Sequence, residues 1–157
     1  MKNQQGFTLI ETLLYIALFT IIMGGAFIAT LQIIEASGSV QEKALIEEEG
    51  HFLVSKINWA LTGADVVNLP SPGIPGATLD IDKFDGSNVT LDGINPNLLI
   101  QPGNTPLNSE NVSVQNVTFT YIDPIGTKPA AVQATFRISG KLTAKFQDFS
   151  TTKYLRR

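Results

Sequence analysis

A lone carboxylate stands at the start of a long apolar segment near the N-terminus of this 157-residue chain. Glu11 follows Gly6, Phe7 and Thr8, and the next 23 residues, 12–34, contain no Asp, Glu, Lys, Arg or His. A carboxylate in a bilayer helix costs about 3 kcal/mol near the helix centre and less toward its end. Glu11 therefore needs a partner if this segment enters a membrane.

The residues alone leave two partners open for Glu11. Thr8 and Glu11 have the Ser/Thr-x-x-Glu spacing of a capping box, in which each side chain accepts a hydrogen bond from a backbone N–H at the helix start. Alternatively, Glu11 pairs with a positive charge brought by another copy of the helix. The first role is local, the second belongs to an assembly, and the two are compatible.

The first eleven residues, Met-Lys-Asn-Gln-Gln-Gly and then Phe-Thr-Leu-Ile-Glu, resemble the leader and cleavage site of type IV pilins and type II secretion pseudopilins. The resemblance implies that a prepilin peptidase cuts after Gly6 and N-methylates the new N-terminal Phe7. It implies that Glu11 pairs with the N-terminal amine of a neighbouring subunit during assembly. The implied partners are other pilin or pseudopilin subunits, the prepilin peptidase, an inner-membrane assembly platform and the lipid bilayer.

The charge-free residues 12–34 have the length of one membrane crossing. At about 1.5 Å per residue such a helix measures about 35 Å, and the hydrocarbon core of a bilayer is about 30 Å thick. Lys2 precedes the segment and Glu35 follows it, so the N-terminus is expected in the cytoplasm. We expect a single-pass protein of the bacterial inner membrane, which enters an extracytoplasmic filament after assembly.

A secretory signal peptide is the competing interpretation of this N-terminus. The apolar region of such a peptide spans about 7–15 residues before an Ala-x-Ala-like site, and Ala36, Ser37 and Gly38 offer small residues for one. The apolar segment here is longer and contains Glu11 near its start, which favours the pilin-like interpretation.

Apolar residues continue at helical spacing after residue 35, in two adjacent rows, of which the first is expected to pack on a sheet. The first row is Ile46, Leu53, Ile57 and Leu61, and the second, at seven-residue intervals, is Leu45, Phe52 and Trp59. Three consecutive glutamates, 47–49, lie partly outside these rows, on a face expected to be solvated or to contact basic groups of a neighbouring subunit.

Gly63 is the expected helix end. The pair Gly24-Gly25 predicts a weak or bent point, since glycine costs about 1 kcal/mol in a helix interior.

The residues after 63 predict antiparallel strands. Short strands are expected at 78–82, 89–92 and 98–101, with hairpin turns at Asp85-Gly86 and Asp92-Gly93 and loops at 66–76 and 102–106. A change of parity near Gln115 predicts a bulge or a crossing between sheets. Residues 132–138 give the clearest alternation, and 141–157 are expected to close the sheet.

This order of elements predicts an α+β protein in which a long N-terminal helix packs on an antiparallel β-sheet domain. The pilin resemblance divides the chain into a leader at 1–6, a transmembrane and assembly helix at 7–34, its amphipathic continuation at 35–63 and a β-rich globular domain at 64–157. The absence of cysteine excludes the C-terminal disulfide loop of many major pilins, which favours a minor subunit.

The remaining residues do not suggest catalysis, a cofactor or a metal site. There is no Gly-x-Ser-x-Gly, phosphate loop or paired-carboxylate arrangement, and His51 is the sole histidine of a chain without cysteine. The acidic residues Asp80, Asp82 and Asp85 do not fit an EF-hand, so turn chemistry or another kind of calcium loop is open for them. Direct nucleic-acid binding is not expected, because the net charge is −3 and the basic residues do not form a run outside the C-terminus.

The expected function is that of a structural subunit of a type IV pilus-like filament or pseudopilus, in a pilus (fimbrium), a secretion system or a competence system. The alternative is a single-pass anchor that displays a binding domain and never polymerises. Cleavage after Gly6 and co-purification with pilin-like partners would separate these two hypotheses.

Overall fold

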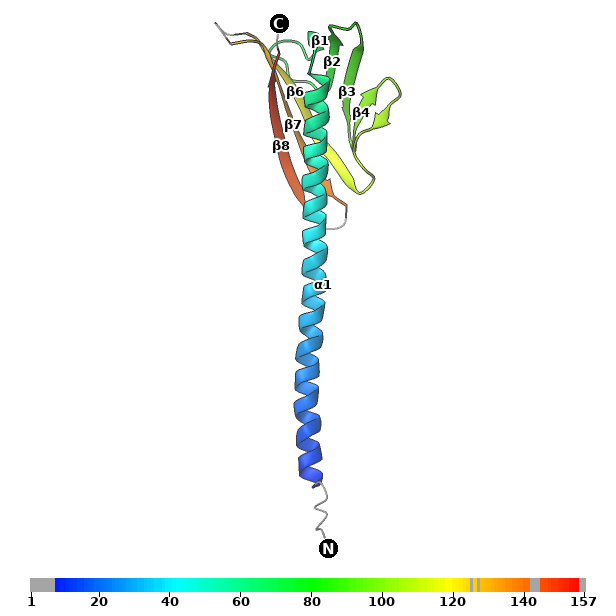
Figure 1. The fold of residues 1–157 in the computed structure, drawn as a ribbon, viewed down its shortest axis with the longest axis vertical. Coiled ribbons are helices and arrows are strands. Elements are labelled where there is room, and N and C mark those ends of the chain that lie inside the picture. Colours follow the sequence, from blue (N-terminus) through cyan, green and yellow to red (C-terminus); the bar gives the residue numbers. More distant parts are fainter. Residues whose placement is uncertain (1–7, 125, 127, 142–144, 156–157) are drawn as a thin grey trace. The chain divides into compact units, whose positions relative to one another are not determined.

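The computed structural model describes residues 8–124, 126, 128–141 and 145–155. Contacts divide the chain into two units, Met1–Gln41 and Glu42–Arg157, which we describe separately. One helix, α1, runs from Leu9 to Ala60 over 52 residues and contributes to both (Figure 1).

Helix α1 is continuous through every glycine within it. The predicted weak point at Gly24-Gly25 does not break the helix, because glycine still forms the helical hydrogen bonds and has only an entropic cost. No proline occurs before Pro70 to remove one of those bonds. The helix ends at Ala60, three residues before the predicted end at Gly63. Gly63 closes the turn that follows, with a φ of 76° in the left-handed region that glycine adopts without steric cost.

Residues 42–157 contain two antiparallel sheets beside the end of α1. The first has the strand order β1 (Ala64–Leu69), β2 (Thr78–Lys83), β3 (Asn88–Ile94), β4 (Asn97–Gln101) and β5 (Thr105–Pro106). The second has the order β6 (Val112–Ile122), β7 (Ala131–Gly140) and β8 (Phe146–Tyr154). A bridge links the sheets, in which the N–H of Gly76 donates to the Phe119 carbonyl at 3.0 Å and the N–H of Phe119 returns the bond at 2.7 Å. The predicted fold class, a long helix packed on antiparallel sheets, is confirmed.

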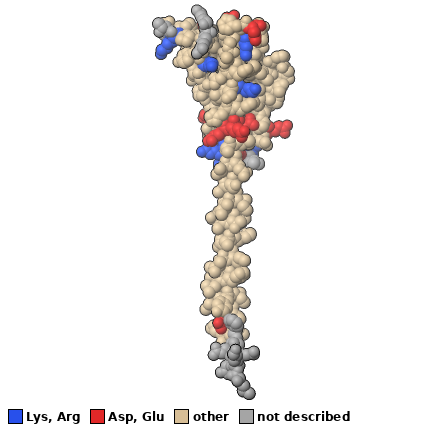
Figure 2. Space-filling view, viewed as in Figure 1, with Lys and Arg blue, Asp and Glu red and all other residues tan. Residues whose placement is uncertain are grey.

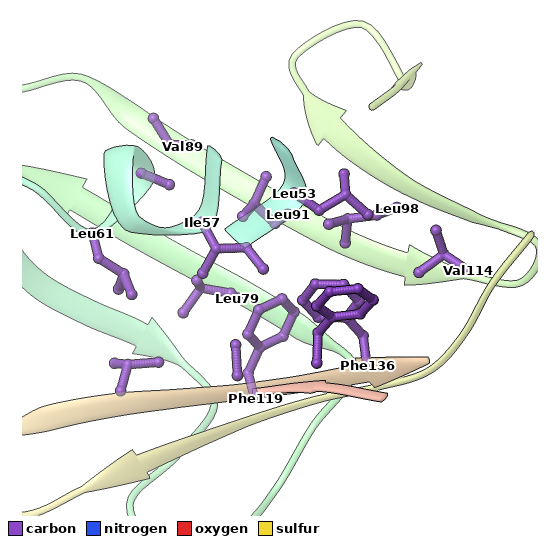
Figure 3. Packing of buried hydrophobic residues seen from close by; sticks show 14 of the residues in the cluster. Leu53, Ile57, Leu61, Leu79, Val89, Leu91, Leu98, Val114, Phe119 and Phe136 are labelled. Atoms are coloured by element: carbon purple, nitrogen blue, oxygen red, sulfur yellow. The ribbon is translucent and has the colours of Figure 1, made fainter. Parts of the chain in front are cut away.

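The core lies between α1 and the two sheets. The first apolar row of α1 is buried, with Ile46, Leu53, Ile57 and Leu61 each at most 2% exposed. Figure 3 shows Leu53, Ile57 and Leu61 directed among strand residues that include Leu79, Phe119 and Phe136. The second row stays outside this core: Leu45 is half-buried, and Phe52 and Trp59 are exposed.

Two predicted features of the first sheet are wrong. Strand β1 occupies the beginning of the segment expected to be a loop, 66–76, and pairs with β2. Asp92-Gly93 is not a turn but lies inside β3; the turn to β4 falls at residues 95–96. Gly93 is needed for close approach instead, because a Cβ there would overlap the side chain of Val117.

The predicted irregularity in β6 is confirmed as a bulge. The pairing of β6 with β7 shifts register between Gln115 and Thr118. Asn116, within the bulge, has a φ of 52°, a left-handed conformation that asparagine tolerates better than most residues. The parity change in the sequence therefore arises because one extra residue is inserted into the ladder.

Two glycines allow close contact between α1 and the second sheet. A Cβ on Gly50 would overlap the ring of Phe149 in β8, and a Cβ on Gly140, at the end of β7, would overlap the carboxylate of Glu42. Glu42 is 5% exposed, so its carboxylate is buried beside this end of β7. The helix and these two strands can therefore pack closely, because one partner in each contact is a glycine.

Candidate functional site

Glu11 lies in the first turn of α1, where a carboxylate is stabilised by the positive end of the helix dipole. Its backbone N–H donates to the carbonyl oxygen of Thr8 at 3.1 Å, and the N–H of Thr12 donates to the same oxygen at 3.2 Å. Thr8 therefore occupies the position before the first helical residue, as the capping interpretation requires. The Glu11 N–H, however, bonds to the Thr8 backbone and not to the Thr8 hydroxyl that a capping box would use.

The Glu11 carboxylate is partly covered by its own helix. The hydroxyl of Tyr15, one turn later, donates to Oε1 of Glu11 at 3.3 Å. The Tyr15 hydroxyl is a neutral donor on an exposed surface. It occupies one of about four acceptor positions of the Glu11 carboxylate. The arrangement leaves Glu11 able to accept further donors, including a cation. Gly6 and Phe7, the predicted cleavage and methylation residues, lie outside the described residues.

The surface that follows Glu11 on α1 is apolar and exposed. Among the described residues, α1 is the helix long and apolar enough to cross a membrane, and none of its apolar window is buried. Figure 2 shows a long stretch of α1 without charged side chains, in agreement with the sequence, which has none in residues 12–34. An exposed apolar surface of this extent is typical of a membrane or protein contact.

The threonine side chains in this stretch are satisfied within the helix. The hydroxyls of Thr12, Thr20 and Thr30 donate to carbonyl oxygens one turn earlier, those of Leu9, Ala17 and Ala26, at 2.8–2.9 Å. Such bonds remove the cost of placing a hydroxyl in hydrocarbon, where water is absent. The helix can therefore enter a bilayer with Glu11 as its one charged group between residues 8 and 34.

The acidic residues that raised the calcium question are engaged by neutral donors. Nδ2 of Asn88 donates to Asp80 and Asp82 at 2.8 Å each, and Asn68 donates to Asp82 at 2.9 Å. These amides, Asn88 first, lower the pKa of Asp82. Asp85 accepts bonds from the hydroxyl and the N–H of Ser87, at 2.6 and 2.9 Å, which lower its pKa in the same way. The Asp85 contact is the expected turn chemistry, whereas the bonds of Asp80 and Asp82 join side chains of neighbouring strands.

His51 has a packing contact with an aromatic ring of β8. Its ring lies 6.2 Å from that of Phe149 in an edge-to-face arrangement. Within the described part of the chain, no group of three His, Cys, Asp or Glu residues could hold a metal ion.

One cluster of aromatic and lysine side chains on the globular unit was not predicted from the sequence. Nζ of Lys83, in β2, lies 4.1 Å from the ring centroid of the exposed Trp59 on α1. Nζ of Lys56 lies 5.3 Å from the ring centroid of Phe52 and 6.0 Å from that of Trp59. The sequence indicated only the apolar row at seven-residue intervals, which contains Phe52 and Trp59. Lys83 of β2 is too distant in sequence for its contact with Trp59 to be predicted.

Comparison with known proteins gives one match. Residues 1–27 match the family model described as the prokaryotic N-terminal methylation motif. No curated protein and no solved structure matches the chain. The matched residues contain Gly6, Phe7 and Glu11 and extend into the exposed apolar stretch of α1. This motif, at the head of a chain with a long apolar helix and antiparallel sheets, supports the assignment of the chain to the type IV pilin and pseudopilin family.

Proposed function

We propose that this chain is a structural subunit of a type IV pilus-like filament or pseudopilus, cut after Gly6, methylated on Phe7 and assembled through α1. The observation that carries the proposal is the exposed apolar surface of α1, which begins within the methylation motif and has Glu11 in its first turn. The motif itself supports a pilin-like substrate of a prepilin peptidase.

The proposal assigns a role to each part of the chain. Residues 1–6 are a leader removed by the peptidase, 7–34 hold the subunit in the bacterial inner membrane, 35–63 continue the helix into the globular unit, and 64–157 form the exported domain. After cleavage, the apolar surface exchanges lipid for the helices of neighbouring subunits at the assembly platform. Nothing in this role requires catalysis or a cofactor.

The mature N-terminus tests the first step. We expect mass spectrometry of the chain from its bacterial host to find N-methylated Phe7 as the first residue. Gly6→Leu should leave the full-length chain in the membrane, because a side chain would crowd the scissile bond. Gln4→Leu, which adds a similar side chain two residues earlier, is the control and should still be cut. A methylated Phe7 end in Gly6→Leu would contradict the cleavage assignment.

The second step is tested by shearing cells and sedimenting the fibres. We expect the cleaved chain in the sheared fraction together with pilin-like partners. A chain that is cut but remains wholly in the membrane would instead indicate an anchored domain that does not polymerise.

A further inference from the structure

Strand β8 presents the long sheet edge that remains uncovered in the described part of the molecule. Of the other edges, β1 leads directly into Pro70, and β5 is a two-residue strand that ends in Pro106. The outer edge of β6 is bonded to the first sheet at Val114 and Phe119. Strand β8 has nine residues, no proline or glycine and no register shift against β7, and Figure 1 shows it at the outer margin of the second sheet. A long regular edge of this kind is a template for a further strand.

The backbone groups that point outward from β8 follow from its register with β7. At one end of the ladder, the N–H of Gly140 donates to the Lys145 carbonyl at 2.9 Å. At the other end, the N–H of Leu155 donates to the Ala130 carbonyl at 2.8 Å. Hydrogen-bonded pairs alternate with non-bonded pairs in an antiparallel ladder, and the register between these ends is unbroken. The odd-numbered residues of β8 are therefore bonded to β7, and the N–H and C=O groups of its even-numbered residues point away from it. Among the described residues, no other element bonds to these outward groups.

A hollow of about 290 Å³ lies on the solvent face of the second sheet beside this edge. Its polar lining comes from three neighbouring strands and consists of Asn116, Thr135, Arg137, Asp148 and Ser150. Thr135 and Ser150 are opposite each other in the ladder, and their short side chains leave the space open. Arg137 and Asp148 neutralise each other through two hydrogen bonds. The hollow can therefore accept a polar side chain without exposing it to an unpaired charge.

A strand added to β8 would match both the edge and the hollow. The N–H and C=O groups of an extended polypeptide repeat at the same two-residue interval as the outward groups of β8. In such strand addition, main-chain hydrogen bonds provide affinity and pockets for alternate side chains provide specificity. Directly opposed residues of paired strands share a face of the sheet. A residue opposite Ser150 would therefore direct its side chain to the solvent face, beside the hollow.

A second copy of this chain fits the edge less well than a different chain does. Pairing of β8 with β8 of another copy uses the same edge twice, so the contact closes as a pair and cannot propagate. Strand β8 runs in the same direction as the end of α1, since Phe149 lies at Gly50 and Thr151 lies at Asn58. Antiparallel pairing of two copies would consequently point their helices in opposite directions. Copies anchored in one membrane cannot adopt that arrangement.

We propose that β8 binds an extended segment of a different protein chain, which adds a fourth strand to the three-stranded second sheet. The segment has about five residues without proline, the usual length of a strand, and presents a polar side chain to the hollow beside Ser150. The inference goes beyond the proposed filament function, because it assigns a partner to the globular unit whether or not the chain polymerises.

Hydrogen exchange at residue resolution tests the added strand on the full chain from its bacterial host. Exchange is measured in native membranes and in sheared fibres, and again after purification in detergent. The odd-numbered residues of β8 are bonded to β7 in every sample and serve as the internal reference. The expected result is the loss of rapid exchange at the N–H groups of Asp148, Ser150 and Thr152 in a native sample alone. Equally rapid exchange of these three groups in native and purified samples would overturn the proposal.

Proline at position 150 isolates the role of the edge, because it removes an outward N–H and leaves the bonds to β7 in place. Ser150→Pro should restore rapid exchange at Asp148 and Thr152, whereas Ser150→Thr, which keeps the N–H, should not. Thermal unfolding in detergent checks that both variants fold. If Ser150→Pro does not fold, Ser150→Lys takes its place, since a lysine on an edge strand opposes pairing and its exposed side chain leaves the ladder intact. Slow exchange that persists in a folded edge variant would overturn the proposal.

Photocross-linking in the host identifies the occupant of the edge. p-Benzoylphenylalanine is placed at Thr152 on β8 and, as the control, at the exposed Ser71 outside the strands. The expected adduct joins Thr152 to a proline-free segment of a different chain, is absent at Ser71 and is lost in the folded edge variant. An adduct between two copies of this chain would overturn the choice of occupant. No adduct at Thr152, or one that persists in the edge variant, would overturn strand addition itself.

Discussion

Gly50 is a residue at which helix α1 and strand β8 approach closely, and its lack of a side chain makes the contact possible. The ring of Phe149 occupies the space that a Cβ on Gly50 would need, and it also stacks on Phe136 with 5.5 Å between ring centroids. The ring is therefore confined between the helix backbone and a second ring.

Gly50→Ala should destabilise the globular unit by about 1–3 kcal/mol, the usual cost of overpacking a core. This outweighs the gain of about 1 kcal/mol that alanine brings to a helix interior. Thermal unfolding of the full chain in detergent measures the effect. Gly38→Ala is the control, since an added Cβ there meets nothing within 4 Å, and it should not lower the melting temperature. Equal melting temperatures for the two variants would show that Phe149 moves aside freely.

Arg137 and Asp148 form a paired contact across β7 and β8. Nε of Arg137 donates to Oδ1 of Asp148 at 2.7 Å and Nη2 donates to Oδ2 at 2.9 Å. These two bonds lower the pKa of Asp148 below its ordinary value of 3.8. The folded state therefore releases a proton more readily at this site than the unfolded state.

The pair consequently stabilises the fold above the ordinary pKa of an aspartate, and this contribution is lost as the pH falls through the lowered pKa. The effect is small because both groups are exposed. Arg137→Gln should raise the pKa of Asp148 toward its ordinary value, as NMR titration of the carboxyl carbon would detect. The pKa of Asp85, which depends on Ser87, is the internal reference and should not move. An unchanged Asp148 pKa would contradict the paired geometry.

At the scale of elements, the bulge in β6 interrupts the register of an 11-residue strand. Asn116 holds the left-handed conformation on which the bulge depends, and the ladder on each side of it is regular. Asn116→Val should cost about 1–2 kcal/mol, because a Cβ in this conformation approaches the following carbonyl oxygen. Asn116→Gly should retain or improve the melting temperature, since glycine adopts the same conformation freely. A valine variant as stable as the glycine variant would mean that the bulge migrates.

The elements predicted from sequence are those whose pattern is strong and local. The buried row of α1 and strand β7 follow from periodic apolar residues, and the bulge follows from a change of parity. Strand β1 was missed because it is an edge strand that runs directly into the proline-rich loop beginning at Pro70. Gly93 was wrongly assigned to a turn. A glycine is required there by a long-range contact with Val117, which a local sequence pattern does not reveal.

The candidate sites divide in the same way. Gly6, Phe7 and Glu11 form a contiguous motif, so they could be named from sequence. The cluster of Phe52, Trp59 and the lysines over their rings could not, because both apolar rows of α1 have helical spacing and only the packing decides which one is buried. Lys83 reaches Trp59 from another element, and sequence distance conceals that contact.

At the scale of the whole molecule, Glu11 is the residue on which entry into a fibre should depend. In the proposed assembly, the amine of Phe7 on an incoming subunit pairs with Glu11 of a neighbour, and the low dielectric around the helices strengthens that pair. Glu11→Ala should still be cut and inserted but should be depleted from sheared fibres relative to the membrane. Glu35→Ala, which removes the carboxylate at the other end of the apolar stretch, is the matched control and should partition as the unaltered chain does. Equal partition of both variants would leave Glu11 as a helix-start residue alone.

Strand β8 has a consequence for how such a subunit is made. It is the last strand along the chain, yet its Phe149 packs against Gly50, and its Thr151 hydroxyl donates to Oδ1 of Asn58 at 3.4 Å. In the topology proposed above, α1 is already anchored while these late residues are still being translated and translocated. The part of the helix around Gly50 and Asn58 therefore lacks its β8 contacts until that strand has been translocated. Subunits truncated before β8 would be anchored in the membrane with an incomplete globular unit. Membrane proteases could recognise them before they reach a growing fibre.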